Sequence, residues 1–443
     1  MSVLIQGGTI ITMNSQNEIL KDVSLLIEGD RIAALLPANS ATAISTGGII
    51  DARNLVIVPG FIQTHVHLCQ TLFRGLADDL QLLDWLREKI FPMEAAHDEQ
   101  SMYISVKAGI AELIRSGTTT ILDMGSISYE EEIIRAIGET GLRAFVGKAM
   151  MDINDIFPKL KEPTKDSLKS TLALAESWHN SYNGRIKYAV APRFVLSCSD
   201  TLMRDAYEMT NDFTGMLFHT HASENKLELE AVRRRCKMDN VEFLHHLGLL
   251  SERSCLAHCI HLNENEVNIL QATKSSISHC PSSNLKLGSG IANIPKLLQK
   301  NITISLGADG APCNNNLDMF REMRLASLLQ KPFHGPTAMD AKTIFDIATI
   351  NGAKALGLEN EIGSIEVGKK ADLTILNLSH IQNPYSDRTN IYSSIVFSSS
   401  PENVDSVMID GKWVYRQKEY CTLDERDTIS KANSELEKLL ERL

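Results

Sequence analysis

An alternation of short apolar strands and amphipathic helices dominates the chain after Leu55. SMYISVKAGIAELIRSG (101–117) is one such helical stretch. Repeated β–α units of this kind pair their strands in parallel, because each strand returns to the sheet through a helix. Eight strands follow the pattern, namely VIVPGFIQTHVH, TTTILDM, AFVGKAM, YAVAPR, GMLFHTH, SCLAHC, SSISHC and ITISLGAD. The expected fold class is therefore α/β, and eight strands favour a closed (β/α)8 TIM barrel over an open sheet.

Both ends of the chain have a β-type pattern instead. Residues 1–55 contain VLIQGG, TIITMN and VSLLIEGDRIAAL, whose Gly29-Asp30 pair suits a tight hairpin. The pattern returns after about residue 360 in ADLTILNL, SSIVFSS and SVMIDGKWVY. Because chain termini often lie close together, we expect one composite β-sandwich from residues 1–55 and 360–420. Residues 56–359 would form the barrel, and residues 421–443 a polar C-terminal helix.

Composition and charge narrow the possible partners of the protein. With 43% hydrophobic and 22% charged residues among 443, the chain has the composition of a soluble globular protein. Its net charge of -11 argues against nucleic acid and anionic membranes, so we expect a small neutral or cationic substrate. The eight cysteines form no CxxC pair, and no leader or long apolar segment is evident. We expect a cytoplasmic homo-oligomer.

Histidines fall where barrel enzymes build their active sites, at the carboxyl ends of the strands. Five of the thirteen histidines end predicted strands, namely His65, His67, His221, His258 and His279. His65 and His67 share one face of an extended strand, so both can bind one ion. His221 and Asp309 would add a third nitrogen and one oxygen. A lone histidine is more often a hydrogen-bonded core residue, but five at strand ends together with Asp309 indicate a metal site.

His219 stands one alternation before His221 and could contact the ion or orient one of its ligands. The remaining histidines lie on predicted helices or loops and are given no role.

The motifs PGFIQTHVHL, HTHASE, LAHC, HCPSSNLKLGSG and LGADGAPCNNNLDM, in this order and spacing, resemble the amidohydrolase superfamily. The resemblance covers nearly the whole chain and is closest to the branch of adenosine-type deaminases, guanine deaminases and s-triazine hydrolases. It implies a barrel flanked by a β-sandwich, and one divalent metal ion per chain, most often zinc and sometimes iron. Matched by position, the implied ligands are His65, His67, His221 and Asp309. Binuclear members carry a carbamylated lysine after the fourth strand, but Arg193 stands there, which supports a single ion.

The resemblance also implies roles in catalysis. Glu224 corresponds to the acid that transfers protons, and His258 to the residue that polarises the attacking water. A bound dication lowers the pKa of water from about 15.7 towards 7, and Asp309 can accept the released proton. Glu224 would protonate a ring nitrogen beside the attacked carbon, because the added hydroxide otherwise leaves an unstabilised negative charge. Ammonia then leaves. A solvated carboxylate opening a helix is the alternative explanation for Glu224.

Four further positions bear on the identity of the substrate, and they favour different substrates. Glu94 matches the residue that accepts the ribose hydroxyls in methylthioadenosine and S-adenosylhomocysteine deaminases. Gln70 and Arg193 match positions where guanine deaminases contact the base, whereas nucleoside deaminases usually have a histidine in place of Arg193. Trp85 lies where relatives place an aromatic ring on the heterocycle, although a partly buried helix tryptophan is equally common. We also assign His279 to substrate binding.

We expect a metal-dependent hydrolase of C–N bonds that deaminates an adenosine-type nucleoside of the 5′-deoxyadenosine, methylthioadenosine or S-adenosylhomocysteine class. The segment DGAPCNNNLDM lacks the glycine-rich run of guanine deaminases, which favours this choice. Guanine deaminase or s-triazine hydrolase is the alternative, since the same activated water can displace chloride or an amine. A non-catalytic scaffold is the remaining interpretation, but scaffolds typically lose ligands, and here every ligand and acid–base position is filled.

Overall fold

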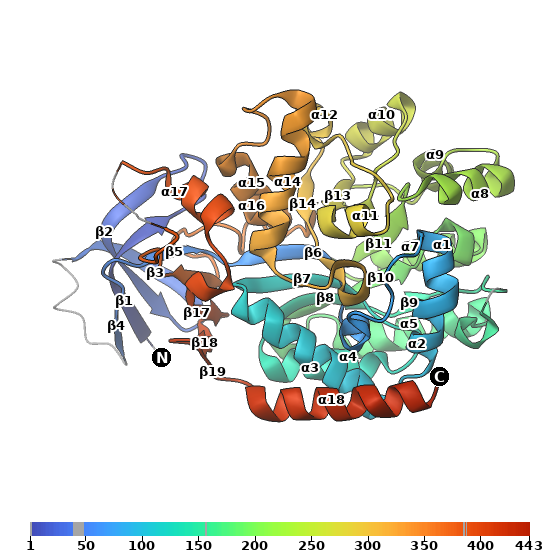
Figure 1. The fold of residues 1–443 in the computed structure, drawn as a ribbon, viewed down its shortest axis with the longest axis horizontal. Helices are drawn as coiled ribbons and strands as arrows, with labels where there is room; N and C mark the ends of the chain where they lie inside the picture. Colours follow the sequence, from blue (N-terminus) through green and yellow to red (C-terminus); the bar gives the residue numbers. More distant parts are fainter. Residues whose placement is uncertain (1, 39–47, 156, 384–385, 387) are drawn as a thin grey trace.

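A closed barrel of parallel strands forms the centre of the computed structural model, which describes residues 2–38, 48–155, 157–383, 386 and 388–443 (Figure 1). Its eight strands, in order around the ring, are β6 (Phe61–His67), β7 (Thr118–Met124), β8 (Arg143–Gly147), β10 (Ile186–Pro192), β11 (Leu217–Ala222), β12 (Ser254–His258), β13 (Ser276–His279) and β14 (Ile304–Leu306). Leu306 of β14 pairs with Gln63 of β6 and closes the ring. The expected α/β barrel is confirmed.

Helices surround the barrel, as the β–α alternation predicts. The longer ones are α3 (Glu99–Arg115), α4 (Glu130–Thr140), α5 (Thr164–Trp178), α7 (Asp200–Glu208), α8 (Lys226–Cys236), α10 (Glu264–Thr273), α14 (Met319–His334) and α15 (Ala341–Ala348). Polar side chains start several of them, because the first backbone N–H groups of a helix need acceptors; Asp98, Asn225 and Asn263 cap α3, α8 and α10. In the described part of the chain, no helix is long and apolar enough to cross a membrane.

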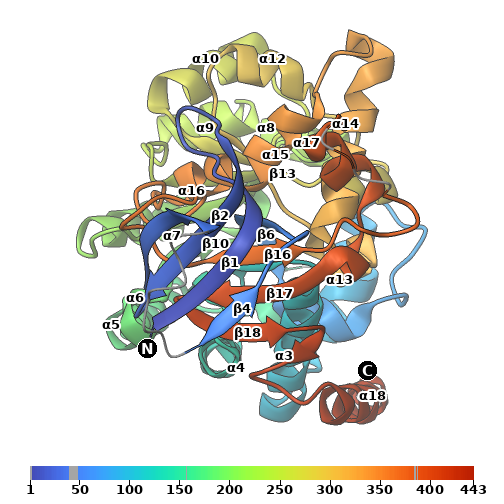
Figure 2. The ribbon, with the colours of Figure 1, turned by 90° about the vertical axis from the view of Figure 1, so that its left-hand side faces the viewer.

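A second sheet is built from both ends of the chain (Figure 2). Its strands are β1 (Ser2–Ile11), β2 (Ile19–Glu28), β3 (Arg31–Pro37), β4 (Ile49–Asp51), β5 (Val56–Pro59), β16 (Leu373–Leu376), β17 (Val404–Ile409), β18 (Lys412–Arg416) and β19 (Glu419–Tyr420). The two halves meet where β5 pairs antiparallel with β16. Glu28 pairs with Arg31 across the hairpin, and Gly29 adopts a positive φ of 63° that this tight turn requires.

Two expected strands differ in the structure. VIVPGFIQTHVH is two strands, because the chain leaves the second sheet after β5 and enters the barrel with β6. Gly60 stands at the crossing, where a Cβ atom would lie 2.1 Å from the Thr119 side chain. The prediction of a strand at SSIVFSS is wrong: residues 391–398 are helical. Ile391 and Ile395 are buried and four residues apart, so one helical face packs inwards and overrides the β preference of the segment.

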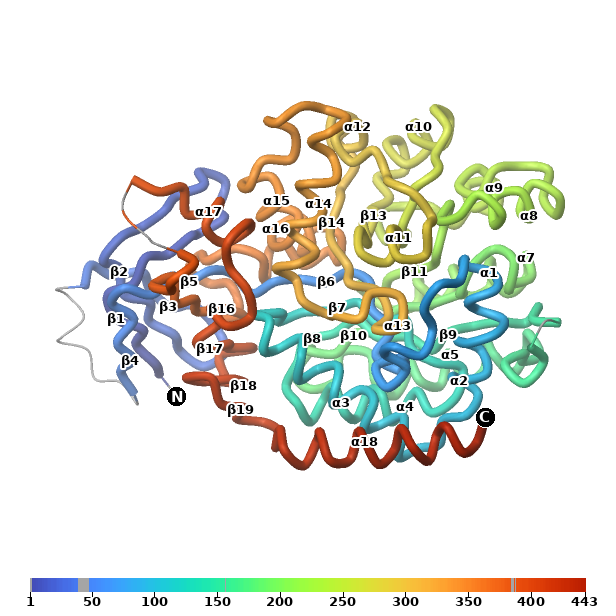
Figure 3. The backbone as a smooth tube through the Cα atoms, viewed as in Figure 1, coloured from blue at the N-terminus to red at the C-terminus, as the bar shows by residue number. Residues whose placement is uncertain are grey.

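Buried ion pairs join the second sheet to the amino-terminal end of the barrel strands. Arg143, which begins β8, donates to Asp372 at 2.6 and 3.0 Å and to Asp410 at 3.1 Å. The sheet therefore covers one end of the barrel, and the carboxyl ends of the strands are left for a functional site. The last helix, α18 (Glu425–Glu441), runs along α3 (Figure 3), and Arg442 Nε beyond it donates to the Ala96 carbonyl oxygen at 2.7 Å.

Candidate active site

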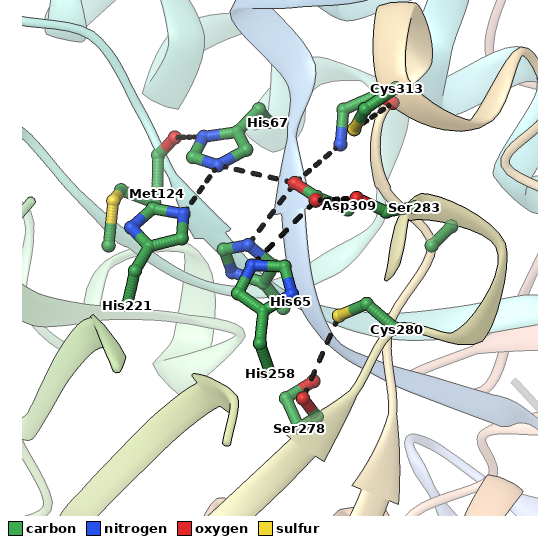
Figure 4. Close-up of polar contacts among 12 residues, drawn as sticks. His65, His67, Met124, His221, His258, Ser278, Cys280, Ser283, Asp309 and Cys313 are labelled. Atoms are coloured by element: carbon green, nitrogen blue, oxygen red, sulfur yellow. Dashed lines mark hydrogen bonds and ion pairs between the residues drawn. The ribbon is translucent and has the colours of Figure 1, made fainter. Parts of the chain in front are cut away.

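Four side chains converge at the carboxyl ends of the barrel strands (Figure 4). They are His65 and His67 of β6, His221 of β11, and Asp309, which begins the short strand β15 (Asp309–Gly310). One ligand atom from each lies within 4.8 Å of the others, and all four residues are buried. The Asp309 Oδ1 atom is 3.2 Å from His65 Nε2 and 3.5 Å from His67 Nε2. The structure thus brings together the four residues that the sequence indicated as metal ligands.

Hydrogen bonds on the far side of each ring determine which nitrogen faces the cluster. His67 Nδ1 donates to the Met124 carbonyl oxygen at 2.7 Å, and His221 Nδ1 donates to that of Arg193 at 2.7 Å. With a proton on Nδ1, each neutral ring turns an Nε2 lone pair towards the cluster. These two Nε2 atoms are only 3.2 Å apart.

His219 orients the third ring. Its Nδ1 atom donates to the Cys255 carbonyl oxygen at 2.8 Å, which leaves its Nε2 atom to accept from His65 Nδ1 at 2.8 Å. His65 Nε2 consequently carries a lone pair and has no hydrogen-bond partner among the described residues. The structure therefore places His219 behind His65, where partners of metal-binding histidines are commonly found.

This arrangement fits one divalent cation. Burial lowers the pKa of His67 to about 3 and also lowers the pKa values of His65 and His221, so the rings are neutral, as metal binding requires. Three lone pairs and one carboxylate oxygen directed at the same point repel one another unless a cation lies between them. Three nitrogen ligands and one oxygen suit zinc and other first-row transition metals.

We expect metal analysis of the purified protein to find about one equivalent of metal per chain, in a four- or five-coordinate site. Dialysis against a chelator should remove the metal and the activity together, and adding the metal back should restore both. X-ray absorption spectroscopy can report the ligand set. Two tightly bound ions bridged by a modified lysine would contradict this expectation.

Glu224 and His258 lie beside the cluster. His258 Nε2 is 3.5 Å from Glu224 Oε2 and 3.8 Å from Asp309 Oδ2. Burial, together with the nearby charges of Asp309 and Glu228, raises the pKa of Glu224 well above 4.5. Glu224 therefore holds a proton more readily than a solvent-exposed carboxyl group and can act as an acid. His258 and Asp309 have positive φ values of 71° and 63°, a strained conformation that clusters at functional sites.

Three supporting residues were not identified from the sequence. Ser283 Oγ donates to Asp309 Oδ2 at 2.6 Å, and Asn284 Oδ1 accepts from His258 Nδ1 at 2.8 Å. Both belong to the short helix α11 (Pro281–Lys286) that follows β13. Glu228 Oε2 accepts from the backbone N–H of Glu224 at 2.8 Å. The capping pattern Asn225-x-x-Glu228 predicts the adjacent bond from the Asn225 N–H to Glu228 Oε2, and this sequence signal could have placed the Glu228 carboxylate next to Glu224.

The residues proposed for substrate binding occupy three different places. Gln70, Trp85 and Arg193 line the cavity that contains the metal-ligand cluster. Glu94 lies behind them and is only 2% exposed. The Glu94 carboxylate accepts hydrogen bonds from both Nη atoms of Arg193 at 2.8 to 3.1 Å. It also accepts one from Gln70 Nε2 at 2.8 Å. His279 is buried and is not among the residues that line this cavity.

A helical segment covers the cavity. It consists of α1 (Leu82–Trp85), the π-helical turn η3 (Leu86–Ile90) and α2 (Phe91–Ala95). Leu82, Trp85 and Leu86 of this segment line the cavity together with Phe194 and Leu287. The cavity of about 30 Å³ has room for only about two water molecules. Binding pockets for drug-sized molecules usually exceed about 300 Å³, so the cavity in this structure is too small to hold a nucleoside.

The barrel and its site define a class, the metal-dependent hydrolases whose catalytic groups lie at the carboxyl ends of the strands. Comparison with known proteins identifies the family within this class. Residues 56–414 match the model of the amidohydrolase family, and the chain belongs to that family. The expected family and the expectation of a hydrolase acting on C–N bonds are confirmed.

The relatives of the chain are similar to it over their full length. A 5′-deoxyadenosine deaminase of Methanobrevibacter smithii is 38% identical over 99% of this chain and 98% of its own length. A 5-methylthioadenosine/S-adenosylhomocysteine deaminase of Syntrophomonas wolfei is 36% identical over 99% of this chain and 100% of its own. The crystal structure of an adenosine deaminase from Xanthomonas campestris with bound zinc has a TM-score of 0.92 and 28% identity, covering 99% of this chain and 98% of its own.

Proposed function

We propose that the protein is a hydrolytic deaminase of adenosine-type nucleosides that uses one zinc ion per chain. The observation that carries the proposal is the cluster of three histidines and Asp309 beside the buried carboxyl group of Glu224, which lies 3.5 Å from His258 Nε2. Full-length similarity to a 5′-deoxyadenosine deaminase and to a 5-methylthioadenosine/S-adenosylhomocysteine deaminase supports the substrate class. The zinc in a similar adenosine deaminase supports the choice of ion.

The side chains around the cluster supply the acid–base chemistry of the reaction. A bound divalent ion lowers the pKa of water from about 15.7 towards 7 and so supplies hydroxide at neutral pH. Asp309, held by Ser283, accepts the proton of the attacking water. Glu224 donates a proton to the ring nitrogen beside the attacked carbon, and His258 hydrogen-bonds to the oxygen added at that carbon. The amino group then takes the proton held by Asp309 and leaves as ammonia, while the hydroxyl group added at the ring carbon returns its proton to Glu224 and becomes the oxo group of the product.

Guanine deamination is the second candidate, and a specific observation favours it. Arg193 and Gln70 both line the cavity, and a guanidinium suits an oxo group of a base.

Glu94, which we assigned to the ribose hydroxyls, already accepts hydrogen bonds from both of these residues. A carboxylate offers about four acceptor sites, and three of the four contacts go to Oε1, so Oε2 can still receive one hydroxyl.

A substrate panel tests the proposal directly. Ammonia release should be measured with the metal-loaded enzyme on 5′-deoxyadenosine, methylthioadenosine, S-adenosylhomocysteine, adenosine and guanine, and release of chloride or amine should be measured on a chloro-triazine. We expect one or more of the nucleosides to have a kcat/KM at least about 10-fold above that of guanine, because differences of this size arise from single groups in a binding pocket. Guanine or the triazine as the best substrate would refute the proposed function.

A further inference from the structure

We propose that His97 is a positioning residue that holds Gln70 in the orientation in which it binds substrate. The sequence left His97 without a role. Because it assumes a substrate that contacts Gln70 in the cavity, this assignment rests on the proposed function. His97 is only 5% exposed and is not among the residues that line the cavity, so its effect on the substrate passes through Gln70.

The His97 ring binds a backbone carbonyl group next to Gln70. His97 Nε2 lies 2.8 Å from the Cys69 carbonyl oxygen. A carbonyl oxygen can only accept a hydrogen bond, so the ring carries a proton on Nε2. This carbonyl belongs to the planar peptide unit that joins Cys69 to Gln70. Holding its oxygen therefore restricts rotation of the backbone from which the Gln70 side chain extends.

Neighbouring groups keep the His97 ring neutral and in this single tautomer. Burial, and to a smaller extent the charge of Arg442, lower the pKa of His97 to about 4. A neutral ring with its proton on Nε2 has a lone pair on Nδ1, which can accept from Ser101 Oγ at 3.0 Å. The ring also packs against Phe73, with centroids 5.2 Å apart. His97 is thus itself held in place on both sides of its ring.

Two hydrogen bonds run side by side between the segment that carries Gln70 and the end of α2. Gln70 Nε2 donates to Glu94 Oε1 at 2.8 Å, and His97 donates to the carbonyl of Cys69. Glu94 and His97 share one turn, because the His97 N–H donates to the Glu94 carbonyl oxygen at 3.5 Å. Two contacts define an orientation, whereas one contact leaves rotation about it. Loss of the His97 contact should therefore loosen Gln70.

Ser105 also contacts the Cys69 carbonyl but cannot replace His97. Its Oγ atom is 3.0 Å from the Cys69 carbonyl oxygen and 2.9 Å from that of Leu68. A serine hydroxyl has a single hydrogen to donate. When this hydrogen serves Leu68, the carbonyl of Cys69 depends on His97.

His97→Phe tests the assignment in the metal-loaded enzyme, with the best substrate of the panel. Phenylalanine keeps a ring against Phe73 but cannot donate to the Cys69 carbonyl. We expect KM to rise about 10-fold while kcat and metal content stay close to those of the parent, because loss of substrate binding alone raises KM. An unchanged KM would overturn the assignment. Loss of metal would also overturn it, since His97 would then act on the metal ligands.

His179→Phe is the matched control. His179 follows α5, on the side of the barrel where β10 begins, and its Nε2 atom donates to the Thr214 carbonyl oxygen at 3.0 Å. Its ring packs against Phe213, with centroids 5.6 Å apart. The substitution therefore removes the same kind of hydrogen bond away from the cavity, and KM should equal that of the parent. An equal rise in KM in both variants would contradict a specific role for His97.

Two shorter polar substitutions separate the hydrogen bond from the ring. His97→Gln keeps an N–H donor at about the reach of Nε2, and its KM should lie within about threefold of the parent value. His97→Asn is too short to reach the Cys69 carbonyl, and its KM should rise as in His97→Phe, so it repeats the test if the phenylalanine variant does not fold. Equal KM values for the glutamine and asparagine variants would contradict the role of this hydrogen bond.

A double variant shows whether His97 acts through Gln70. In a Gln70→Ala background, His97→Phe should change KM by less than about twofold, because the side chain that it positions is already absent. Equal effects of His97→Phe in the parent and in this background would overturn the assignment. Guanine or the triazine as the best substrate would refute the proposed function in the panel itself. The same cycle on that substrate would still test His97, so the two failures are distinguishable.

Discussion

Replacement of Glu224 by glutamine is expected to lower kcat by about 10²-fold or more, the usual scale for a positioned acid–base group, while the metal remains bound. Glutamine keeps the size and hydrogen-bonding capacity of the side chain but cannot release a proton to the substrate. Burial and two nearby carboxylates raise the pKa of Glu224, which favours the protonated form that donates to the substrate. The substitution therefore removes proton transfer and leaves the four metal ligands in place.

His67→Ala is the matched comparison for Glu224→Gln. Removing the His67 ring deletes one nitrogen from the cluster, so metal content and turnover should fall together. Metal analysis and kcat should be measured on the same preparations of the two variants. If Glu224→Gln retained full activity, or lost its metal as His67→Ala does, then Glu224 would not be the proton-transfer acid.

The strand-end histidines show how far the sequence alone could predict the site. Side chains two residues apart share a face of a strand, so the spacing of His65 and His67 is enough to place them together. The barrel brings His221 and Asp309 to the same point, because the carboxyl ends of its parallel strands meet in one ring. Predicting the cluster therefore needs only the order of strands and the alternation of side chains, and both are strong signals in the sequence.

Other features depend on tertiary contacts and could not be predicted. The helix at residues 391–398 forms where a β-branched run favoured a strand, because packing of one buried face decided between the two. His219 could be placed near the metal site, but its role required the hydrogen bond between His65 and His219, which links residues 154 positions apart. The ion pair between Arg193 and Glu94 likewise joins residues 99 positions apart, and nothing local in either segment indicates it.

The ion pair between Arg193 and Glu94 predicts a large loss of stability when Glu94 is replaced by alanine. Arg193 is 2% exposed and its charge is balanced by Glu94, so Glu94→Ala leaves a buried guanidinium without its partner. Removing one member of a buried pair typically destabilises a protein by about 3–5 kcal/mol. We expect a loss of this size in the free energy of unfolding, measured by chemical denaturation. The double variant Glu94→Gln with Arg193→Met, which removes both charges, should recover most of the loss. Equal destabilisation of both variants would contradict the explanation.

Because Glu94 also holds Arg193, a substitution of Glu94 can lower kcat/KM in two ways. Loss of a ribose contact alone would weaken kcat/KM by about 1.5–3 kcal/mol for nucleosides and leave guanine unaffected. Disorder of Arg193 would instead weaken binding of every substrate, since Arg193 and Gln70 line the cavity. Glu94→Gln separates the two effects, because it keeps the shape of the side chain. If Glu94 Oε2 receives a ribose hydroxyl, the ratio of kcat/KM for 5′-deoxyadenosine to that for guanine should fall about 10-fold in this variant. An unchanged ratio, with both values lowered together, would show that Glu94 serves only to hold Arg193.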